Sequence, residues 1–98
     1  MSRTTDFTAE LFRAANQIET LTSPERVRLI ERAAATIQAQ KDLLADRARV
    51  VPISFGVTAD LKWMKAQAPK MPEVLSAVVM LKCAEEIRRL RILLETDD

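Results

Sequence analysis

The sequence predicts an all-α protein, a small bundle of about four helices in one domain that spans residues 1–98. Helix-favouring Ala, Leu, Arg and Glu dominate the chain, and only one glycine and four prolines interrupt it. Apolar residues make up 48% of the chain and charged residues 30%, a balance typical of globular proteins with a modest core. Apolar residues also recur at helical spacing in four segments, which we expect to be the helices.

We expect residues 1–5 to be disordered and the first helix to span residues 6–21. Asp6, or Thr5 before it, is the predicted N-cap, because its side-chain oxygen can accept a free backbone N–H. One amphipathic stripe then follows at helical spacing. It consists of Phe7, Leu11, Ala14, Ile18 and Leu21.

The second predicted helix spans residues 24–49. Ser23 is its predicted N-cap, Pro24 suits the first helical position, and Glu25 suits the positive end of the helix dipole. A narrow seam at three- and four-residue spacing, broken at Lys41, predicts a long helix that packs against an antiparallel neighbour. The seam consists of Val27, Ile30, Ala34, Ile37, Leu44 and Ala48.

The segment 50–71 is the predicted crossover to the last helix. Its first part, 50–57, is apolar and β-branched, and we expect Ile53 and Phe55 to enter the core. Thr58 is the predicted cap of a short third helix, 59–68, which ends before Pro69. The fourth helix spans residues 72–95, and we expect it to pack antiparallel to the second helix.

The fourth helix carries apolar residues on two sides. Its main seam consists of Met80, Cys83, Ile87, Leu90 and Leu94. A second stripe, Val74, Val78 and Leu81, lies off that seam in the first half of the helix. A helix that is apolar on two sides needs two covers, so either a short helix of the same chain or another chain must bury the second stripe.

The residue types that are missing exclude most catalytic sites. The chain has no histidine, one cysteine and one glycine. It therefore lacks the usual proton shuttle, the usual zinc ligands and a phosphate-binding glycine loop. We expect no enzyme activity, no metal and no cofactor, and we interpret Cys83 as a small buried hydrophobe. A single cysteine, with no secretory signal and no membrane-spanning run, favours a cytoplasmic protein.

The charge pattern makes nucleic acid an unlikely partner. The net charge is +1, which provides no long-range attraction to phosphates. Arg88, Arg89 and Arg91 form the densest basic cluster, but acids four residues away are expected to pair on this face, as Glu85–Arg89, Lys82–Glu86 and Arg91–Glu95. The third and fourth helices have the scale of a helix-turn-helix, yet the fourth begins with apolar residues that we expect to be buried. A small DNA-associated regulator remains an alternative.

What remains is a protein-interaction module with more apolar surface than one helix pair needs. The candidate partner-binding residues are Leu29, Leu43, Trp63, Val74, Val78 and Leu81. Leu29 and Leu43 lie off the seam of the second helix, while Trp63 either caps the core or anchors an interface. The two stripes also allow a homodimer, and a structural subunit of a helical homo-oligomer is a further alternative.

The order of the predicted elements is similar to that of a known class of proteins. The run Ser-Pro-Glu-Arg-Val-Arg-Leu-Ile-Glu-Arg-Ala-Ala-Ala-Thr-Ile is followed by a loop and a long last helix that ends Leu-Arg-Ile-Leu-Leu. Over residues 23–95 this arrangement resembles the small helical antiactivators that silence quorum-sensing transcription regulators of conjugative transfer. The resemblance implies a protein that binds and inhibits a transcriptional activator. It covers the order of elements and no invariant motif, so it assigns no functional residue.

Overall fold

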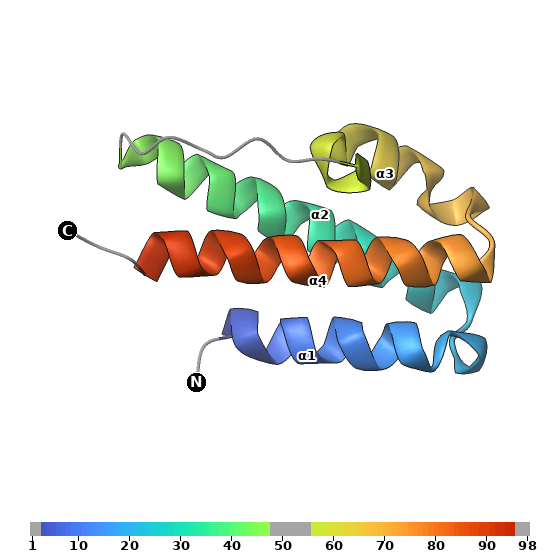
Figure 1. Cartoon of the computed structure of the whole chain (residues 1–98). Helices are drawn as coiled ribbons and strands as arrows, with labels where there is room; N and C mark the ends of the chain where they lie inside the picture. Colours follow the sequence, from blue (N-terminus) through green and yellow to red (C-terminus); the bar gives the residue numbers. More distant parts are fainter. Residues whose placement is uncertain (1–2, 48–55, 96–98) are drawn as a thin grey trace.

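The computed structural model describes residues 3–47 and 56–95, and no strand occurs among them (Figure 1). The α-helices are α1 (Arg3–Asn16), α2 (Ser23–Asp46), α3 (Leu61–Gln67) and α4 (Glu73–Glu95). The short 3₁₀ helices are η1 (Ile18–Thr20), η2 (Gly56–Ala59) and η3 (Ala68–Lys70). The predicted all-α bundle, with two long and two shorter helices, is confirmed. None of the described helices combines the length and the hydropathy that a membrane crossing requires.

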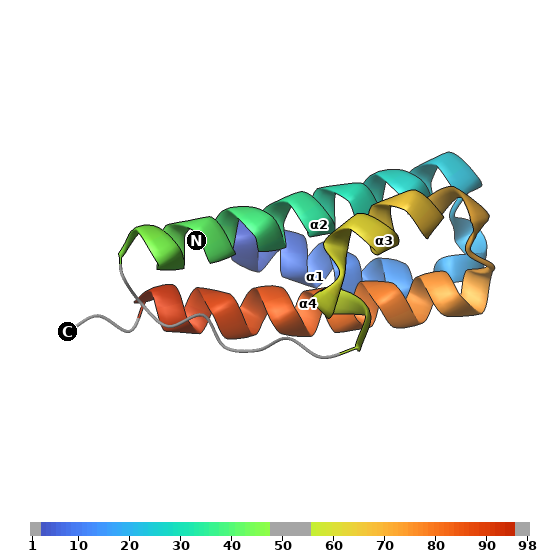
Figure 2. The same cartoon turned by 90° about the horizontal axis from the view of Figure 1, so that it is seen from above.

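The last helix, α4, is the centre of the bundle. It packs along α1 and along α2, whereas α1 and α2 make little backbone contact with each other (Figures 1 and 2). The predicted seam of α4 is confirmed, since Met80, Cys83, Ile87 and Leu90 are fully buried and Leu94 is half-buried. Each buried aliphatic side chain of this size stabilises the fold by about 1.5–3 kcal/mol.

The two long helices run in the same direction, so the predicted antiparallel pairing of α2 with α4 is wrong. Three contacts along the pair each join residues 47 positions apart, and only parallel helices keep such a separation constant. They are Arg26 Nη1 to Glu73 Oε2 (3.9 Å), Gln40 Nε2 to Ile87 O (3.0 Å) and Arg47 Nη1 to Leu94 O (3.0 Å). A heptad seam predicts that a helix has a neighbour but does not give its direction. The long connection, which contains α3, returns the chain to the end where α2 began (Figure 1). The first helix, α1, is joined to α2 by a short turn and is antiparallel to both long helices.

The first helix begins earlier and ends earlier than predicted. Residues 3–5, which we expected to be disordered, belong to α1, and Thr5 and Asp6 lie inside the helix instead of capping it. The Thr8 hydroxyl donates to the backbone oxygen of Thr4 (2.8 Å), which is possible only once this turn is helical. The predicted helix 6–21 ends at Asn16, because Gln17 leaves the helical region and the chain continues as η1.

The start of α2 is a capping box one residue before the predicted cap. Thr22, not Ser23, is the N-cap, and its backbone N–H donates to Glu25 Oε1 (2.7 Å) while its hydroxyl oxygen accepts from Glu25 N–H (3.3 Å). The box requires an acidic residue three positions after the cap, which Thr22 has and Ser23 lacks. The Thr22 backbone hydrogen bond is the main cause that lowers the pKa of the Glu25 carboxyl, and the Thr22 side chain adds to it.

This depressed pKa predicts an acid-sensitive helix start. A carboxyl whose pKa is lower in the folded state stabilises the fold above its unfolded value near 4.5, and that contribution is lost as the pH falls through the folded pKa. We expect Glu25→Ala to lower the melting temperature at pH 7 and to differ less from the wild type at acid pH. Thermal melts at pH 7 and pH 3 measure this, with Glu31→Ala as the control, an exposed acid of the same helix. A deficit of equal size at both pH values would contradict the prediction.

The short third helix also starts later than predicted. Asp60, not Thr58, is its N-cap, because Asp60 Oδ1 accepts the backbone N–H of Trp63 (2.9 Å). Thr58 is buried within η2, one element earlier. The predicted helix 59–68 is therefore divided between the end of η2, α3 and the start of η3. The second helix ends at Asp46, with Arg47 as its C-cap, three residues before the predicted end at residue 49. The predicted burial of Ile53 and Phe55 lies outside the described residues.

Candidate functional site

The outer face of α4 carries three of the five large apolar residues that are exposed in the described chain. We define this face by Val74, Val78, Leu81, Glu85, Arg88 and Ile92, which follow one another at alternating spacings of four and three residues. Val74 is 76% exposed, Val78 43% and Ile92 50%, while Leu81 is half-buried. Exposure to this degree shows that none of the described helices covers Val74, Val78 or Ile92. An alternating four–three spacing is the repeat with which helices pair side by side.

The described chain therefore provides no element that buries the second stripe of α4, which was expected from the sequence to be covered. The third predicted helix could have supplied this cover through Leu61, Met64 and Trp63. Instead α3 packs mainly on α2, where Met64 is buried and Leu61 half-buried. It approaches α4 on the inner side, where Cys83 Sγ donates to Met64 Sδ (3.5 Å).

A hollow marks the second half of the outer face. It has a volume of about 380 Å³ and is open to solvent. Four residues line it, at positions i, i+3, i+4 and i+7 of the helix, the same set that receives an inserted side chain in a coiled coil. They are Glu85, Arg88, Arg89 and Ile92.

One wall of this hollow is fixed by an ion pair. Arg89 donates to both carboxylate oxygens of Glu86, with Nη2 at 2.8 Å from Oε2 and Nε at 3.1 Å from Oε1. The Glu86 side chain is 8% exposed, and bidentate pairs of this kind hold a guanidinium in one orientation. Arg89 therefore presents a formed wall to a ligand and not a freely moving side chain.

The pairing of charges on α4 differs partly from the prediction. Arg91 and Glu95 do pair, at 3.4 Å. The predicted Glu85–Arg89 and Lys82–Glu86 pairs are replaced by Glu86–Arg89 and Lys82–Glu85, each three residues apart instead of four. The exchange follows from burial, because Glu86 lies at the edge of the core and Arg89 binds both of its carboxylate oxygens there. Among the described residues, Glu85 forms one loose ion pair, 4.0 Å from Lys82 Nζ.

The six predicted partner-binding residues do not form one surface. Val74, Val78 and Leu81 lie together on the outer face of α4. Leu29 and Leu43 lie on α2, half-buried and 47% exposed, and Trp63 lies on α3 with 41% of its surface exposed. Of the two interpretations of Trp63, the exposed ring favours an interface anchor over a core cap.

Leu29 lines a groove between α1 and α2. The groove has a volume of about 390 Å³, and Leu21 forms the rest of its apolar lining. Arg32 bridges it, with Nη1 3.3 Å from Glu10 Oε1 and the guanidinium carbon 4.0 Å from the centre of the Phe7 ring. The groove exists because α1 and α2 both pack on α4 and not on each other. Its rim mixes both signs of charge, so it favours no particular class of partner.

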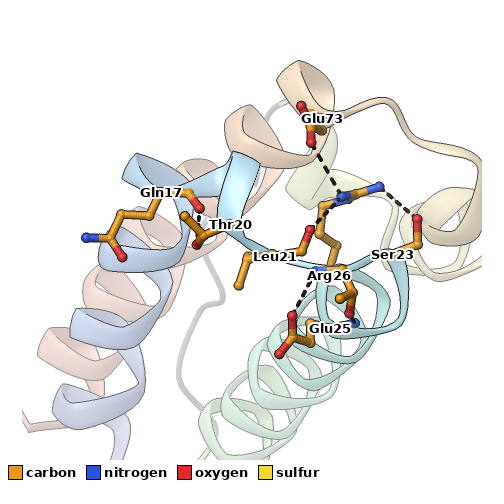
Figure 3. A network of polar contacts seen from close by, with 8 residues as sticks. Gln17, Thr20, Leu21, Ser23, Glu25, Arg26 and Glu73 are labelled. Atoms are coloured by element: carbon orange, nitrogen blue, oxygen red, sulfur yellow. Dashed lines mark hydrogen bonds and ion pairs between the residues drawn. The ribbon is translucent and has the colours of Figure 1, made fainter.

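A polar cluster fixes the end of the bundle where the outer face begins (Figure 3). Arg26 donates to the backbone oxygen of Leu21 (3.2 Å) and to Ser23 Oγ (2.9 Å), and it lies 3.9 Å from Glu73 Oε2. Only 14% of the Arg26 side chain is exposed. The cluster ties the first turn of α4 to the α1–α2 connection, and Val74 lies in that turn.

The first turn of α4 corrects one argument against DNA binding. We expected a buried start, but Glu73 and Val74 are exposed. Exposed acidic and aliphatic side chains make no contact with phosphates. The expectation that nucleic acid is not a partner therefore depends on the charge pattern and no longer on a buried helix start.

The only cysteine is a core residue in the structure. Burial, together with the smaller effect of the nearby Glu86 carboxylate, raises the pKa of the Cys83 thiol to about 12. The thiolate that nucleophilic or metal-binding cysteines need is therefore disfavoured at neutral pH. In the described residues no cluster of three potential metal ligands occurs.

Sequence reasoning missed Ile92 and the hollow beside it. The four–three spacing of Val74, Val78 and Leu81 continues to Ile92. This spacing could have identified Ile92 as part of the same face. The charged residues at the intermediate positions, Glu85 and Arg88, conceal the continuation in a search for apolar residues.

The chain matches no protein-family model, no curated protein and no solved structure. Its function is therefore inferred from the geometry of its own residues.

Proposed function

We propose that this chain is a non-catalytic protein-interaction module whose binding surface is the outer face of α4. The observation that carries the proposal is the exposure of Val74, Val78 and Ile92 along one side of a helix whose other sides are packed. Removing apolar surface from water favours association by about 25 cal/mol per Å², before the entropy costs of binding are subtracted. A protein that lays an apolar helix along this face gains that energy with little rearrangement of α4.

The residue types of the chain support a binding role over a catalytic one. There is no histidine to carry protons near neutral pH, and the one thiol is buried with a raised pKa. The hollow on α4 is lined by arginines and a glutamate on one exposed helix surface, without the enclosed apolar pocket typical of small-molecule sites.

The specific role that we propose is inhibition of a transcriptional activator in the cytoplasm. The basis is the resemblance of residues 23–95 to small helical antiactivators in the order of their elements. A helix-on-helix contact also suits an activator target, because amphipathic helices recognise grooves and faces through residues at i, i+3, i+4 and i+7. The near-neutral net charge is compatible with blocking an activator directly and not competing for its DNA.

Capture from the native host tests the proposal. The wild-type chain is immobilised beside Val78→Glu, which introduces a charge into the outer face, and Ala35→Glu, which places the same charge on an exposed position of α2. We expect the wild type and Ala35→Glu to retain the same activator and Val78→Glu to lose it. The purified activator should then lose its operator binding when the wild-type chain is added.

Two results would contradict the proposal. Equal retention of partners by Val78→Glu and the wild type would place the binding surface elsewhere. A captured protein that is no transcription regulator would remove the antiactivator role while leaving the interaction module in place.

A further inference from the structure

The geometry points to a second copy of this chain as the occupant of the outer face of α4, packed antiparallel about a twofold axis. This inference rests on the proposed function, because it concerns the same surface: the second copy occupies it in the free protein, and an activator that binds there has to displace that copy. Three features carry it: the length of the repeat, the preformed hollow and the order of the charges along the face.

The repeat is long enough for a helix pair. From Val74 to Ile92 the outer face has six positions at alternating spacings of four and three, which is the heptad seam of a coiled coil. A heptad seam packs best against another heptad seam. The described chain offers no second uncovered one, since the seams of α2 and α4 that face inward are already buried. A second copy supplies an identical seam.

The apolar residues fix the register. In an antiparallel pair, every one of the six positions finds a partner only when Val74 faces Ile92 of the second copy. Val78 then faces Arg88, and Leu81 faces Glu85. This register joins the two most exposed aliphatic side chains, Val74 and Ile92, at both ends of the interface. Because the interface is isologous, each of these contacts occurs twice.

The hollow fits this register. Val78 of the second copy lies level with Arg88 and therefore over the hollow formed by Glu85, Arg88, Arg89 and Ile92. A valine side chain inserted between these four residues is a knob in a hole. The Glu86–Arg89 pair holds one wall of the hollow in place, which lowers the entropy lost on association.

The charges select the antiparallel direction. In a parallel pair, Glu85 would face Glu85 and Arg88 would face Arg88 of the second copy, and like charges in facing positions destabilise a helix pair. In the antiparallel register, each charged residue faces an aliphatic one, and its charged end can extend to solvent at the rim. In this register Leu81 of the second copy faces Glu85, and Lys82 is the residue next to Leu81. Lys82 of one copy therefore lies near Glu85 of the other, and their opposite charges attract each other.

Sedimentation equilibrium of the full chain tests the assembly. We expect the wild type to reach twice the chain mass of 11.0 kDa at micromolar to millimolar concentrations. Val74→Glu and Ile92→Glu, both at exposed positions, are expected to raise the dimer dissociation constant at least about tenfold and to remain folded by circular dichroism. Ala35→Glu serves as the control, because it adds the same charge outside the face. A monomeric wild type, or dimers that these substitutions leave unchanged, would overturn the inference.

Disulfide trapping tests the register. The native Cys83 is buried with a raised pKa, so introduced cysteines react without competition from it. Leu81→Cys and Glu85→Cys are expected to cross-link with each other in a mixture faster than either cross-links with itself. Self-linking of each variant would show a parallel pair. Preferred linking of Glu85→Cys with Arg88→Cys would show a register shifted by one heptad, and either result would overturn the arrangement inferred here.

The two proposals fail in different ways. If the chain is monomeric but Val78→Glu loses a captured activator, the second copy is wrong and the interaction module stands. If the chain dimerises in the inferred register and captures no other protein, the second copy stands and the antiactivator role fails.

Discussion

Replacing Ile87 by alanine is expected to lower the free energy of unfolding by about 2–5 kcal/mol. Ile87 has no exposed surface and lies in the centre of α4, on the side that faces the core. The substitution removes the energy of burying the lost carbon atoms and leaves a cavity that the packed helices fill only in part. In a domain of this size, such a loss is a large share of the total stability. Urea denaturation followed by circular dichroism measures it.

Ile92→Ala is the matched control for Ile87→Ala. It is the same change in the same helix, but half of the Ile92 surface is exposed. We expect a change within about 0.5 kcal/mol, because alanine also has the higher helix propensity. Measurements at several protein concentrations separate any contribution of self-association, which makes stability depend on concentration. Equal losses for the two variants would show that α4 is not packed as described.

Gln40→Glu is expected to destabilise the fold by about 3–5 kcal/mol at pH 7, although the two side chains have nearly the same shape. Gln40 is 5% exposed, and its Nε2 donates across the α2–α4 interface to the backbone oxygen of Ile87 (3.0 Å). A carboxylate has no hydrogen to donate there, and it places a negative charge against a carbonyl oxygen in the core. Two acceptors then face each other without a proton between them.

The effect of Gln40→Glu should depend on pH in a defined direction. Burial raises the pKa of the introduced carboxyl above its unfolded value near 4.3, so its neutral form is favoured in the folded state. The variant should therefore approach wild-type stability below that unfolded value and lose stability as the pH rises through the folded pKa. Thermal melts from pH 3 to pH 8 measure this, with Gln17→Glu at an exposed position as the control. A pH-independent loss would contradict the explanation by charge burial.

The candidate site could be predicted in part. Val74, Val78 and Leu81 were identified from their distance to the main seam of the last helix, because helical periodicity gives the angle between two stripes. Whether a stripe is covered depends on where the other helices lie, and α3 packs on α2 instead. Ile92 and the hollow could not be found by hydrophobicity, since two of the six positions of the face are charged.

The sequence by itself determined the number of helices, their approximate extent and the main buried seams. These properties depend on neighbours along the chain: a proline at the start of α2, an acidic residue three positions after a cap, and apolar residues at helical spacing. The caps moved by one or two residues, from Ser23 to Thr22 and from Thr58 to Asp60, because several oxygen-bearing side chains compete at each helix start.

Only the tertiary structure decided the direction of the long helices and the surface left uncovered. A heptad seam is the same for a parallel and an antiparallel neighbour, so the sequence pattern does not distinguish them. The contacts between the helices do distinguish them, because Arg26–Glu73, Gln40–Ile87 and Arg47–Leu94 keep one constant separation along the pair. The same alignment turns the main seam of α4 towards α1 and α2, and a helix that packs on that side exposes Val74, Val78 and Ile92 on the other.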